Sequence, residues 1–313
     1  MIVHQGVNSI SEITKPILTV GTFDGIHLGH QKIIKRIIEI AKNEGGESVL
    51  LTFHPHPRLV LFPEDESIKM INSIDEKIEL LEELGLDHII LMKFEPELSR
   101  LSPVDYVRNI LVSKIGIHKI VIGYDHHFGR NREGNIELLR ELGPIYEFEV
   151  EEISALSIDA INISSTKIRK AVTSGDMLKA REYLGHNFMI SGKVIHGKKI
   201  GRSIGFPTAN IELSSKNKLL PKNGVYLVNV SIGGESYDGV LNIGKNPTVS
   251  ENKGDTKIEI HLFDFDSNIY GAEVVLKVKK RIRSEQKFEG IEALKAQITS
   301  DVQIAKTWII ENV

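Results

Sequence analysis

The stretch 17-ILTVGTFDGIHLGHQKIIKRIIEIAK-42 decides the fold of the first half of this chain. It opens with the mostly apolar run Ile17–Val20, typical of a short buried strand, and closes with the spacing of an amphipathic helix. The turn between them holds three glycines and two histidines. A helix N-terminus offers free N–H groups and partial positive charge, so this turn suits a phosphate group. His27 and His30 should share one face and donate hydrogen bonds as charge builds on a leaving pyrophosphate. The alternative is a glycine turn with two surface histidines.

Three more short, apolar runs before residue 124 are expected to form strands buried on both faces. Helical runs separate them, and this alternation predicts βαβ units around a parallel sheet. The loops after parallel strands open at one edge of the sheet, beside His27. The expected strands are 48–53, 88–92 and 119–123, and the expected helices are 31–42, 75–85, 103–116, 164–175 and 176–185.

The pattern changes after residue 187, where strands follow one another without long helices. The run 223–244 predicts a hairpin, because two alternating segments flank Gly233-Gly234, a dipeptide suited to a tight turn. Strands at 257–265 and 273–283 follow, which favours an antiparallel barrel or sandwich. A last run, 289–313, has helical spacing and should pack on it. We therefore predict two domains, residues 1–186 and 187–313.

Composition narrows the class of protein. Hydrophobic residues make up 41% and charged residues 26%, as in an ordinary globular protein. The net charge of -3 disfavours nucleic acid as a partner. The chain has no cysteine, which excludes disulfides, a thiolate nucleophile and cysteine-based zinc sites. No apolar run approaches the ~20 residues of a membrane span, and no signal peptide is evident, so we expect a cytoplasmic protein without a membrane partner. Its oligomeric state is not predicted.

A second candidate site lies in 201-GRSIGFPTANIEL-213. Pro207 fixes the backbone, and the hydroxyl of Thr208 and amide oxygen of Asn210 suit a hard cation such as Mg²⁺ beside ATP phosphates. The preceding glycines, Gly201 and Gly205, are able to wrap phosphate. In the alternating strand 258–265, the carboxylate of Glu259 is placed to take a proton from an attacking hydroxyl. The alternatives are a loop leading into an edge strand and a solvent-facing glutamate.

The turn at 21–30 resembles the H-x-G-H signature of the nucleotidyltransferase superfamily, which transfers NMP groups from NTPs. The segment 163-ISSTKIR-169 resembles its second signature, at an expected helix start. The resemblance implies a Rossmann-like α/β domain. It also implies that His27 and His30 are catalytic and that ATP binds to Gly21, Phe23, Gly25, His27, His30, Ser164, Ser165, Thr166 and Arg169.

Two loops resemble those of the bacterial bifunctional riboflavin kinase/FAD synthetase family: 52-TFHPHPRLVLF-62 and 123-GYDHHFGRNREGN-135. By this resemblance, the flavin side of the first domain is lined by 54-HPHP-57, which includes Pro55 and Pro57, and by Phe62 and Phe128. Asp125 and Arg132 lie where nucleotide and flavin meet. The chain departs from the family pattern at His126, where the family often has an aromatic residue.

The second half resembles the riboflavin kinase domain of the same family in G-R-x-x-G-F-P-T-A-N, N-G-V-Y, E-I-H-L-F-D-F and 281-RIRSEQKF-288. This resemblance implies an antiparallel barrel with a C-terminal helix. It makes Thr208 and Asn210 the ligands of Mg-ATP and Glu259 the catalytic base. The remaining implied contacts are Gly201, Gly205 and Pro207 to ATP, and Arg283 and Glu285 to the flavin.

Together these resemblances imply a bifunctional enzyme that converts riboflavin to FMN and FMN to FAD with Mg²⁺ and ATP. A second hypothesis keeps the nucleotidyltransferase but gives it another acceptor, with the barrel as a regulatory flavin-binding module. A non-enzymatic hypothesis pairs an RNA-binding barrel with an ATP sensor. It predicts exposed clusters of aromatic residues and strands rich in lysine and arginine, whereas aromatic residues make up only 6% of the chain.

Overall fold

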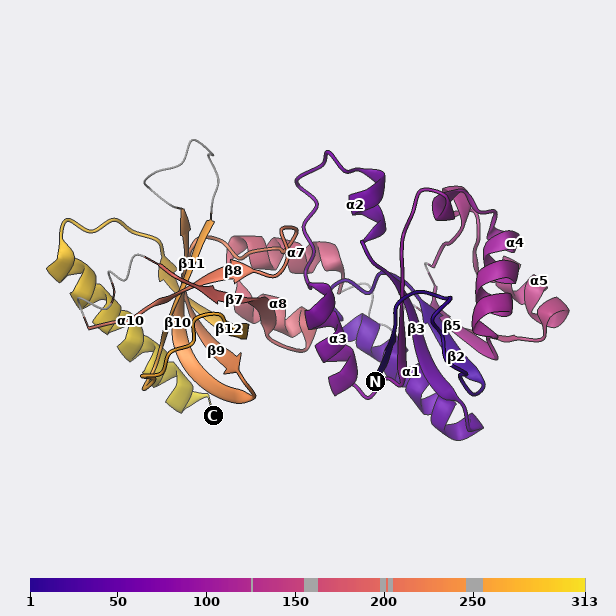
Figure 1. Ribbon diagram of the computed structural model, residues 1–313, viewed down its shortest axis with the longest axis horizontal. Coiled ribbons are helices and arrows are strands. Elements are labelled where there is room, and N and C mark those ends of the chain that lie inside the picture. Colours follow the sequence, from indigo (N-terminus) through magenta and orange to yellow (C-terminus); the bar gives the residue numbers. More distant parts are fainter. Residues whose placement is uncertain (125, 155–162, 198–200, 202–204, 246–255, 313) are drawn as a thin grey trace. The chain divides into compact units, whose positions relative to one another are not determined.

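The structure is a computed structural model of the chain, and its contacts divide the chain into two compact units (Figure 1). The first comprises Met1–Lys69 and Lys77–Ser165, and the second comprises Met70–Glu76 and Thr166–Val313. The chain therefore leaves the first unit, contributes a short segment to the second, and returns at Lys77. The structure describes every residue except 125, 155–162, 198–200, 202–204, 246–255 and 313.

The first unit is built on a six-stranded sheet in the order β1-β4-β3-β2-β5-β6, in which every neighbouring pair is parallel. The order reverses at β2, because the chain runs from β2 through β3 to β4 on one side and places β5 on the other. Ligands of such sheets bind at this kind of switch point, beyond the carboxyl ends of the strands. The strands are β1 (Ile2–His4), β2 (Pro16–Val20), β3 (Glu47–Phe53), β4 (His88–Met92), β5 (Lys119–Gly123) and β6 (Glu149–Ile153).

Helices cover the sheet because its strands are apolar on both faces. Side chains of β2 to β5 pack with α4 (Pro103–Tyr106) and the α5 helix (Ile136–Tyr146) in one buried cluster. Helix α4 continues as a π-helical stretch, Val107–Ile115, which ends at a glycine, so the predicted helix 103–116 is confirmed. Helix α1 (Leu28–Glu44) packs against β2 and β3. The described part of this unit also contains α2 (Pro57–Leu61), most of α3 (Ile74–Glu83) and two short 3-10 helices, Leu98–Arg100 and Arg130–Arg132.

The second unit is a closed antiparallel barrel in the order β10-β11-β8-β7-β12-β9, so the barrel is confirmed and a sandwich is excluded. The predicted hairpin is β9 with β10, and its turn residues Gly233 and Gly234 have φ of 57° and 88°, which favour glycine. The strands are β7 (Phe188–Ile195), β8 (Ala209–Leu213), β9 (Gly224–Ile232), β10 (Glu235–Lys245), β11 (Thr256–Leu262) and β12 (Glu273–Ser284).

Two helices and one distant segment complete the core of the second unit. Helices α7 (Ser165–Ser174) and α8 (Met177–Leu184) bury their apolar faces among the barrel side chains. In the segment Met70–Glu76, the buried carboxylate of Glu76 accepts hydrogen bonds from the Ser191 N–H at 2.8 Å and from the Lys218 ammonium. These contacts join residues more than a hundred positions apart.

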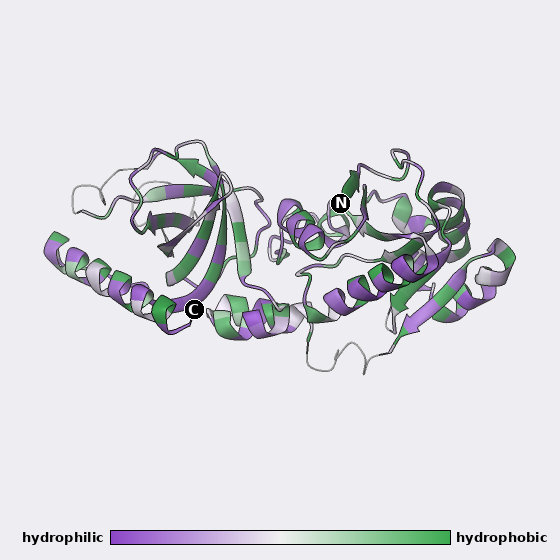
Figure 2. Cartoon of the chain, turned by 90° about the horizontal axis from the view of Figure 1, so that it is seen from below, coloured by the Kyte–Doolittle hydropathy of each residue, from purple (hydrophilic) through white to green (hydrophobic). Residues whose placement is uncertain are grey.

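The C-terminal helix α10 (Ile291–Glu311) confirms the last predicted element. Figure 2 shows hydrophilic and hydrophobic bands alternating along it. Its residues Val302, Ala305 and Trp308 pack into a cluster with side chains of β9, β10 and β12. The helix therefore packs on the barrel and brings its own polar side chains to the barrel wall.

Candidate active sites

A cavity of about 1020 Å³ lies in the first unit, at the carboxyl ends of its strands. It is lined by the turn after β2, the segment after β3, the residues after β4 together with Tyr106, the loop after β5, and the residues leading into α7. The predicted site residues that line it are Gly21, Phe23, His27, His30, Pro57, Phe62, Phe128, Arg132, Ser164 and Ser165.

The other predicted residues of this site lie elsewhere. Gly25 is buried within the turn, and Pro55 is exposed. Thr166 and Arg169 lie on α7, within the second unit, so their role with ATP stays a prediction. Asp125 lies outside the described residues.

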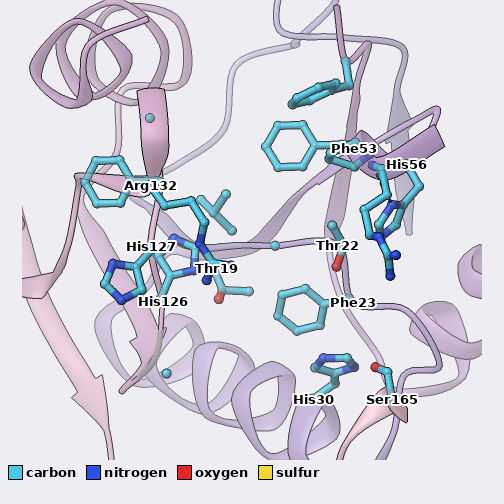
Figure 3. Close-up of a pocket in the computed structure, with 18 of the residues that line it drawn as sticks. Thr19, Thr22, Phe23, His30, Phe53, His56, His126, His127, Arg132 and Ser165 are labelled. Atoms are coloured by element: carbon cyan, nitrogen blue, oxygen red, sulfur yellow. Dashed lines mark hydrogen bonds between the residues drawn. The ribbon is translucent and has the colours of Figure 1, made fainter. Parts of the chain in front are cut away.

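The turn after β2 brings the two histidines together. His27 caps α1, because its Nδ1 accepts a hydrogen bond of 3.3 Å from the His30 N–H. The two rings stack with centroids 3.6 Å apart. The Phe23 ring centroid lies 4.7 Å from that of His30, and Figure 3 shows these two side chains next to each other. Phe23 and Ile26 have φ of 44° and 40°, a strained conformation for residues with side chains. The predicted shared face of the two histidines is confirmed.

His30 is a neutral imidazole near pH 7. Burial holds the pKa of His30 well below its ordinary value, and the neighbouring His27 and Lys77 lower it further. Its buried Nδ1 has no hydrogen-bond partner within the part of the chain that the structure describes. The ring is therefore able to offer a hydrogen bond without carrying a charge.

The second signature lies beside the first. The Ser165 hydroxyl donates a 3.0 Å hydrogen bond to the backbone carbonyl of Asp24, in the middle of the turn. Figure 3 shows Ser165 next to His30. This contact, between residues 141 positions apart, places the start of α7 at the phosphate-suited turn.

Aromatic side chains form the opposite wall of the cavity. Phe53 and Phe94 meet edge to face at 5.7 Å, and Phe128 lies 5.8 Å from the Tyr106 ring. His126 stacks on Phe128 at 6.0 Å and an interplanar angle of 26°, so the imidazole retains a stacking ring where the sequence departs from the family. His56, which belongs to the predicted segment 54–57, also lines the cavity. Sequence reasoning missed the lining residues Phe53, Arg58, Phe94, Tyr106, Tyr124 and His127, of which Arg58, Tyr124 and His127 directly adjoin predicted site residues.

A second cavity, of about 330 Å³, lies in the barrel unit. Gly201, Thr208, Glu259, Arg283 and Glu285 line it, as the sequence predicted. Asn210 is paired with Glu259 across β8 and β11, and directly opposed residues project to the same face. Gly205 and Pro207 do not line this cavity.

Two partners of these residues were not predicted. The Glu259 carboxylate forms a 2.6 Å ion pair with Lys257, two positions earlier on β11. Arg283 donates from Nε and Nη2 to the carboxylate of Asp301, at 2.9 and 2.8 Å. Asp301, on α10, is only 2% exposed and also accepts from the Gln297 amide at 2.9 Å. No local pattern marks Asp301, because an acidic residue on a helix usually faces solvent.

An adjoining cavity of about 570 Å³ shares Thr208 with the barrel cavity. Pro207, His196, Asn268 and Tyr270 also line it, and the His196 and Tyr270 rings lie 3.9 Å apart. Thr208 thus lines both the cavity that holds the tilted His196–Tyr270 ring pair and the cavity that holds Glu259.

The donor set at Thr208 and Asn210 fits Mg²⁺. It consists of a hydroxyl and an amide oxygen, with the carboxylate of Glu259 opposite Asn210. Neither the Thr208 nor the Asn210 side chain hydrogen-bonds to another described residue. Among the described residues, no cluster of three histidine, aspartate or glutamate side chains forms a metal cage. A sparse oxygen set of this kind suits Mg²⁺, which keeps waters and substrate phosphates as its other ligands.

The fold and the two sites define a two-unit transferase, with a nucleotidyltransferase sheet and a kinase barrel. Residues 9–167 match the family model for FAD synthetase, and residues 184–309 match the model for riboflavin kinase. The chain belongs to the family of bifunctional riboflavin kinase/FMN adenylyltransferases. This confirms the resemblance found in the sequence. No helix in the described ranges is long and apolar enough to cross a membrane.

Relatives match over nearly the full length. The chain is 40% identical to a bifunctional riboflavin kinase/FMN adenylyltransferase of Buchnera aphidicola from Acyrthosiphon pisum, with 98% of each chain covered. It is 38% identical to one from Listeria monocytogenes, with 92% of this chain and 90% of the relative covered. A crystal structure described as a macrolide-efflux protein from Streptococcus pneumoniae superposes with a TM-score of 0.87 at 28% identity, over 98% of this chain and 99% of the other.

Proposed function

We propose that this chain catalyses two successive transfers from ATP. The barrel unit moves the γ-phosphoryl group of ATP to the 5′-hydroxyl of riboflavin, giving FMN and ADP. The sheet unit then moves AMP from a second ATP to FMN, giving FAD and pyrophosphate. One observation carries this proposal: each unit has a cavity of its own, lined by signature residues of one of the two matched families.

In adenylyl transfer, a phosphate oxygen of FMN attacks the α-phosphorus of ATP, and pyrophosphate leaves. No covalent enzyme intermediate is needed, so positioning and charge stabilisation supply the catalysis. The N-terminus of α1 directs N–H groups at the phosphates, and His27 and His30 hydrogen-bond to them as charge builds on the leaving group. The Ser165 hydroxyl stabilises the turn through its hydrogen bond to the Asp24 carbonyl.

The isoalloxazine ring of FMN takes the aromatic side of the same cavity. Pro57, Phe62 and Phe128 offer apolar surface there, and Arg132 lies close enough in the loop to meet a phosphate. His126, stacked on Phe128, extends this surface. Offset stacking on such a wall orients a flat ring with its phosphate end toward α1.

In riboflavin phosphorylation, Glu259 accepts the proton of the attacking 5′-hydroxyl. Lys257 holds the carboxylate through their ion pair, and Arg283 and Glu285 orient the flavin in the cavity. Thr208 and Asn210 would hold Mg²⁺, which supplies charge neutralisation of the ATP phosphates when bound. The polyphosphate reaches this point from the adjoining cavity, past Pro207.

Small molecules are the proposed partners: riboflavin, FMN and ATP. The net charge of -3 offers no field for a nucleic-acid backbone. We also propose that the catalytic domains divide at residues 186 and 187, and that the protein works in the cytoplasm without a membrane partner.

The direct test supplies purified protein with riboflavin, ATP and Mg²⁺ and follows flavins by chromatography. FMN should appear first and FAD after it. If FMN supplied directly yields no FAD, the adenylylation half is wrong, and if riboflavin yields no FMN, the kinase half is wrong.

Two substitutions separate the sites. Asn210→Ala should abolish riboflavin phosphorylation and leave the adenylylation of supplied FMN intact, because Asn210 pairs with Glu259 in the barrel unit whereas His30 belongs to the sheet unit. His30→Ala should do the reverse. Equal loss of both activities in either folded variant contradicts the assignment of sites to units.

A further inference from the structure

The mechanism above leaves one buried cation near the adenylylation cavity unused. Lys77, in the first turn of α3, is only 6% exposed, and lysine is rarely buried without a partner. Its ammonium donates a 2.6 Å hydrogen bond to the backbone carbonyl of Thr22. Thr22 belongs to the turn that carries His27 and His30, and it lines the cavity.

The Thr22 carbonyl is held by two donors. Besides Lys77, the Thr52 hydroxyl donates to it at 3.3 Å. In a trans peptide, the carbonyl and the following N–H point in opposite directions. Anchoring the carbonyl of Thr22 therefore directs the N–H of Phe23 away from Lys77. This N–H has no hydrogen-bond partner among the described residues, and Phe23 lines the cavity.

The anchored peptide sits in strained backbone. Phe23 follows it with φ of 44°, and Ile26 has φ of 40°, so the turn persists only where its surroundings hold it. The holding contacts on this turn include those of Lys77 and Thr52 with the Thr22 carbonyl and that of Ser165 with the Asp24 carbonyl. Lys77 is the only one of these side chains that brings a positive charge to the turn.

We infer that Lys77 is a positioning residue for adenylyl transfer: its ammonium fixes the Thr22 peptide so that the turn offers a free N–H and positive potential to the leaving pyrophosphate. This inference rests on the proposed adenylylation of FMN. Lys77 itself touches no substrate, since it is not part of the cavity wall. It acts through Thr22 and Phe23.

The charge of Lys77 also bears on its neighbours. Burial lowers the pKa of Lys77 to about 8, and the carboxylate of Asp24 opposes this shift. The positive charge in turn lowers the pKa of His30, after burial and His27. Among the described residues, Asp24 and His30 are thus ionisable groups that interact with the charge of Lys77. Above pH 8 the ammonium loses its proton, so the anchor and its charge weaken together.

The experiment compares Lys77→Met with the unsubstituted protein, using supplied FMN and ATP. The kcat for FAD formation should fall by about 100-fold, the size expected when a reacting group is misplaced by about 1 Å. The KM for FMN should change less than about threefold, because the flavin wall is untouched. Riboflavin phosphorylation by the same preparation should be unchanged, since that cavity lies in the other unit.

The pH profile separates positioning from mere structural support. The unsubstituted protein should lose adenylylation on an alkaline limb near pH 8. Lys77→Arg keeps the charge at all working pH values, so it should restore kcat to within about tenfold and abolish the alkaline limb. Lys35→Met, which removes the same charge from an exposed position on α1, should leave both kcat and the limb unchanged.

The inference is overturned if Lys77→Met keeps kcat within about threefold of the unsubstituted protein, or if Lys77→Arg retains the alkaline limb. Thermal unfolding reports whether Lys77→Met folds. If it does not fold, the presence or absence of the alkaline limb in the pH profile of Lys77→Arg tests the inference. Absence of FAD formation by the unsubstituted protein contradicts the proposed function instead, and is a separate result.

Discussion

Replacing Asp301 with asparagine should lower the stability of the barrel unit and weaken riboflavin binding in its cavity. Asp301 lies on α10, a helix that contains none of the predicted site residues. The Asp301 carboxylate is 2% exposed and holds the Arg283 guanidinium through Nε and Nη2. Arg283 lines the cavity beside Glu259, and its guanidinium carbon lies 5.7 Å from the Phe288 ring. Asparagine keeps the volume but removes the charge and sets an N–H donor against the guanidinium.

The expected size follows from the geometry. Removing one partner of a buried ion pair costs about 3–5 kcal/mol, because the other charge stays behind unpaired. Arg283 retains some solvent contact, so we take the lower end, about 3 kcal/mol. At about 2–4 °C per kcal/mol for a unit of this size, the transition of the barrel unit should fall by about 6–12 °C. The KM for riboflavin should rise, because Arg283 is no longer held in place.

Differential scanning fluorimetry and steady-state assays of both reactions measure these effects. Asp264→Asn is the matched control. The Asp264 side chain is 85% exposed and forms a 3.3 Å ion pair with Lys306, which lies on α10 as Asp301 does. Exposed pairs contribute about 0–1 kcal/mol, and asparagine tolerates the φ of 52° at this position. The reasoning is refuted if Asp301→Asn melts within about 1 °C of Asp264→Asn with an unchanged riboflavin KM.

Three further predictions concern the buried and catalytic groups. Lys218→Met leaves the Glu76 carboxylate buried and unpaired, so thermal denaturation should show a loss of about 3–5 kcal/mol, whereas the exposed control Lys222→Met should show almost none. Glu259→Gln should lower the kcat of riboflavin phosphorylation by about 10²–10⁴ in a coupled ADP assay; a smaller loss rules out a base role. His30 has a lowered pKa, so its contribution to stability is present above pH 6.5, the ordinary histidine pKa, and is lost as pH falls below it. Urea unfolding from pH 7.5 to 5 should show this slope in the unsubstituted protein and a shallower one in His30→Gln.

The sequence predicted the central strands of the sheet because each is a largely apolar run. Such a run is recognised from the local sequence, without knowledge of the strand it pairs with. The edge strands β1 and β6 were not predicted. Ile2–His4 is too short for a pattern, and Glu149–Ile153 carries three acidic residues. Edge strands are exposed on one side and so lose the apolar signal that marks a buried strand.

The candidate sites were predictable where function leaves a local signature. The turn at His27 and His30 and the strand at Thr208 to Asn210 each place their chemistry within a few residues, and both line or flank a cavity. No local sequence signature identifies Lys77 or Asp301 as part of a site. Each is a charged residue in a helical run, a pattern that usually belongs to a solvated face.

The sequence by itself determined the two kinds of domain, their order and the signatures of two ATP-dependent reactions, because strand and helix periods and motif spacings are local properties of the chain. Only the tertiary structure decided that the barrel closes, that residues 70–76 belong to the second unit, and that Lys77 and Asp301 are buried beneath functional residues. These outcomes depend on which distant segments exclude water from one another. A charged side chain in a helix has the same local pattern whether it faces solvent or a buried carbonyl, and only the partner it meets distinguishes the two.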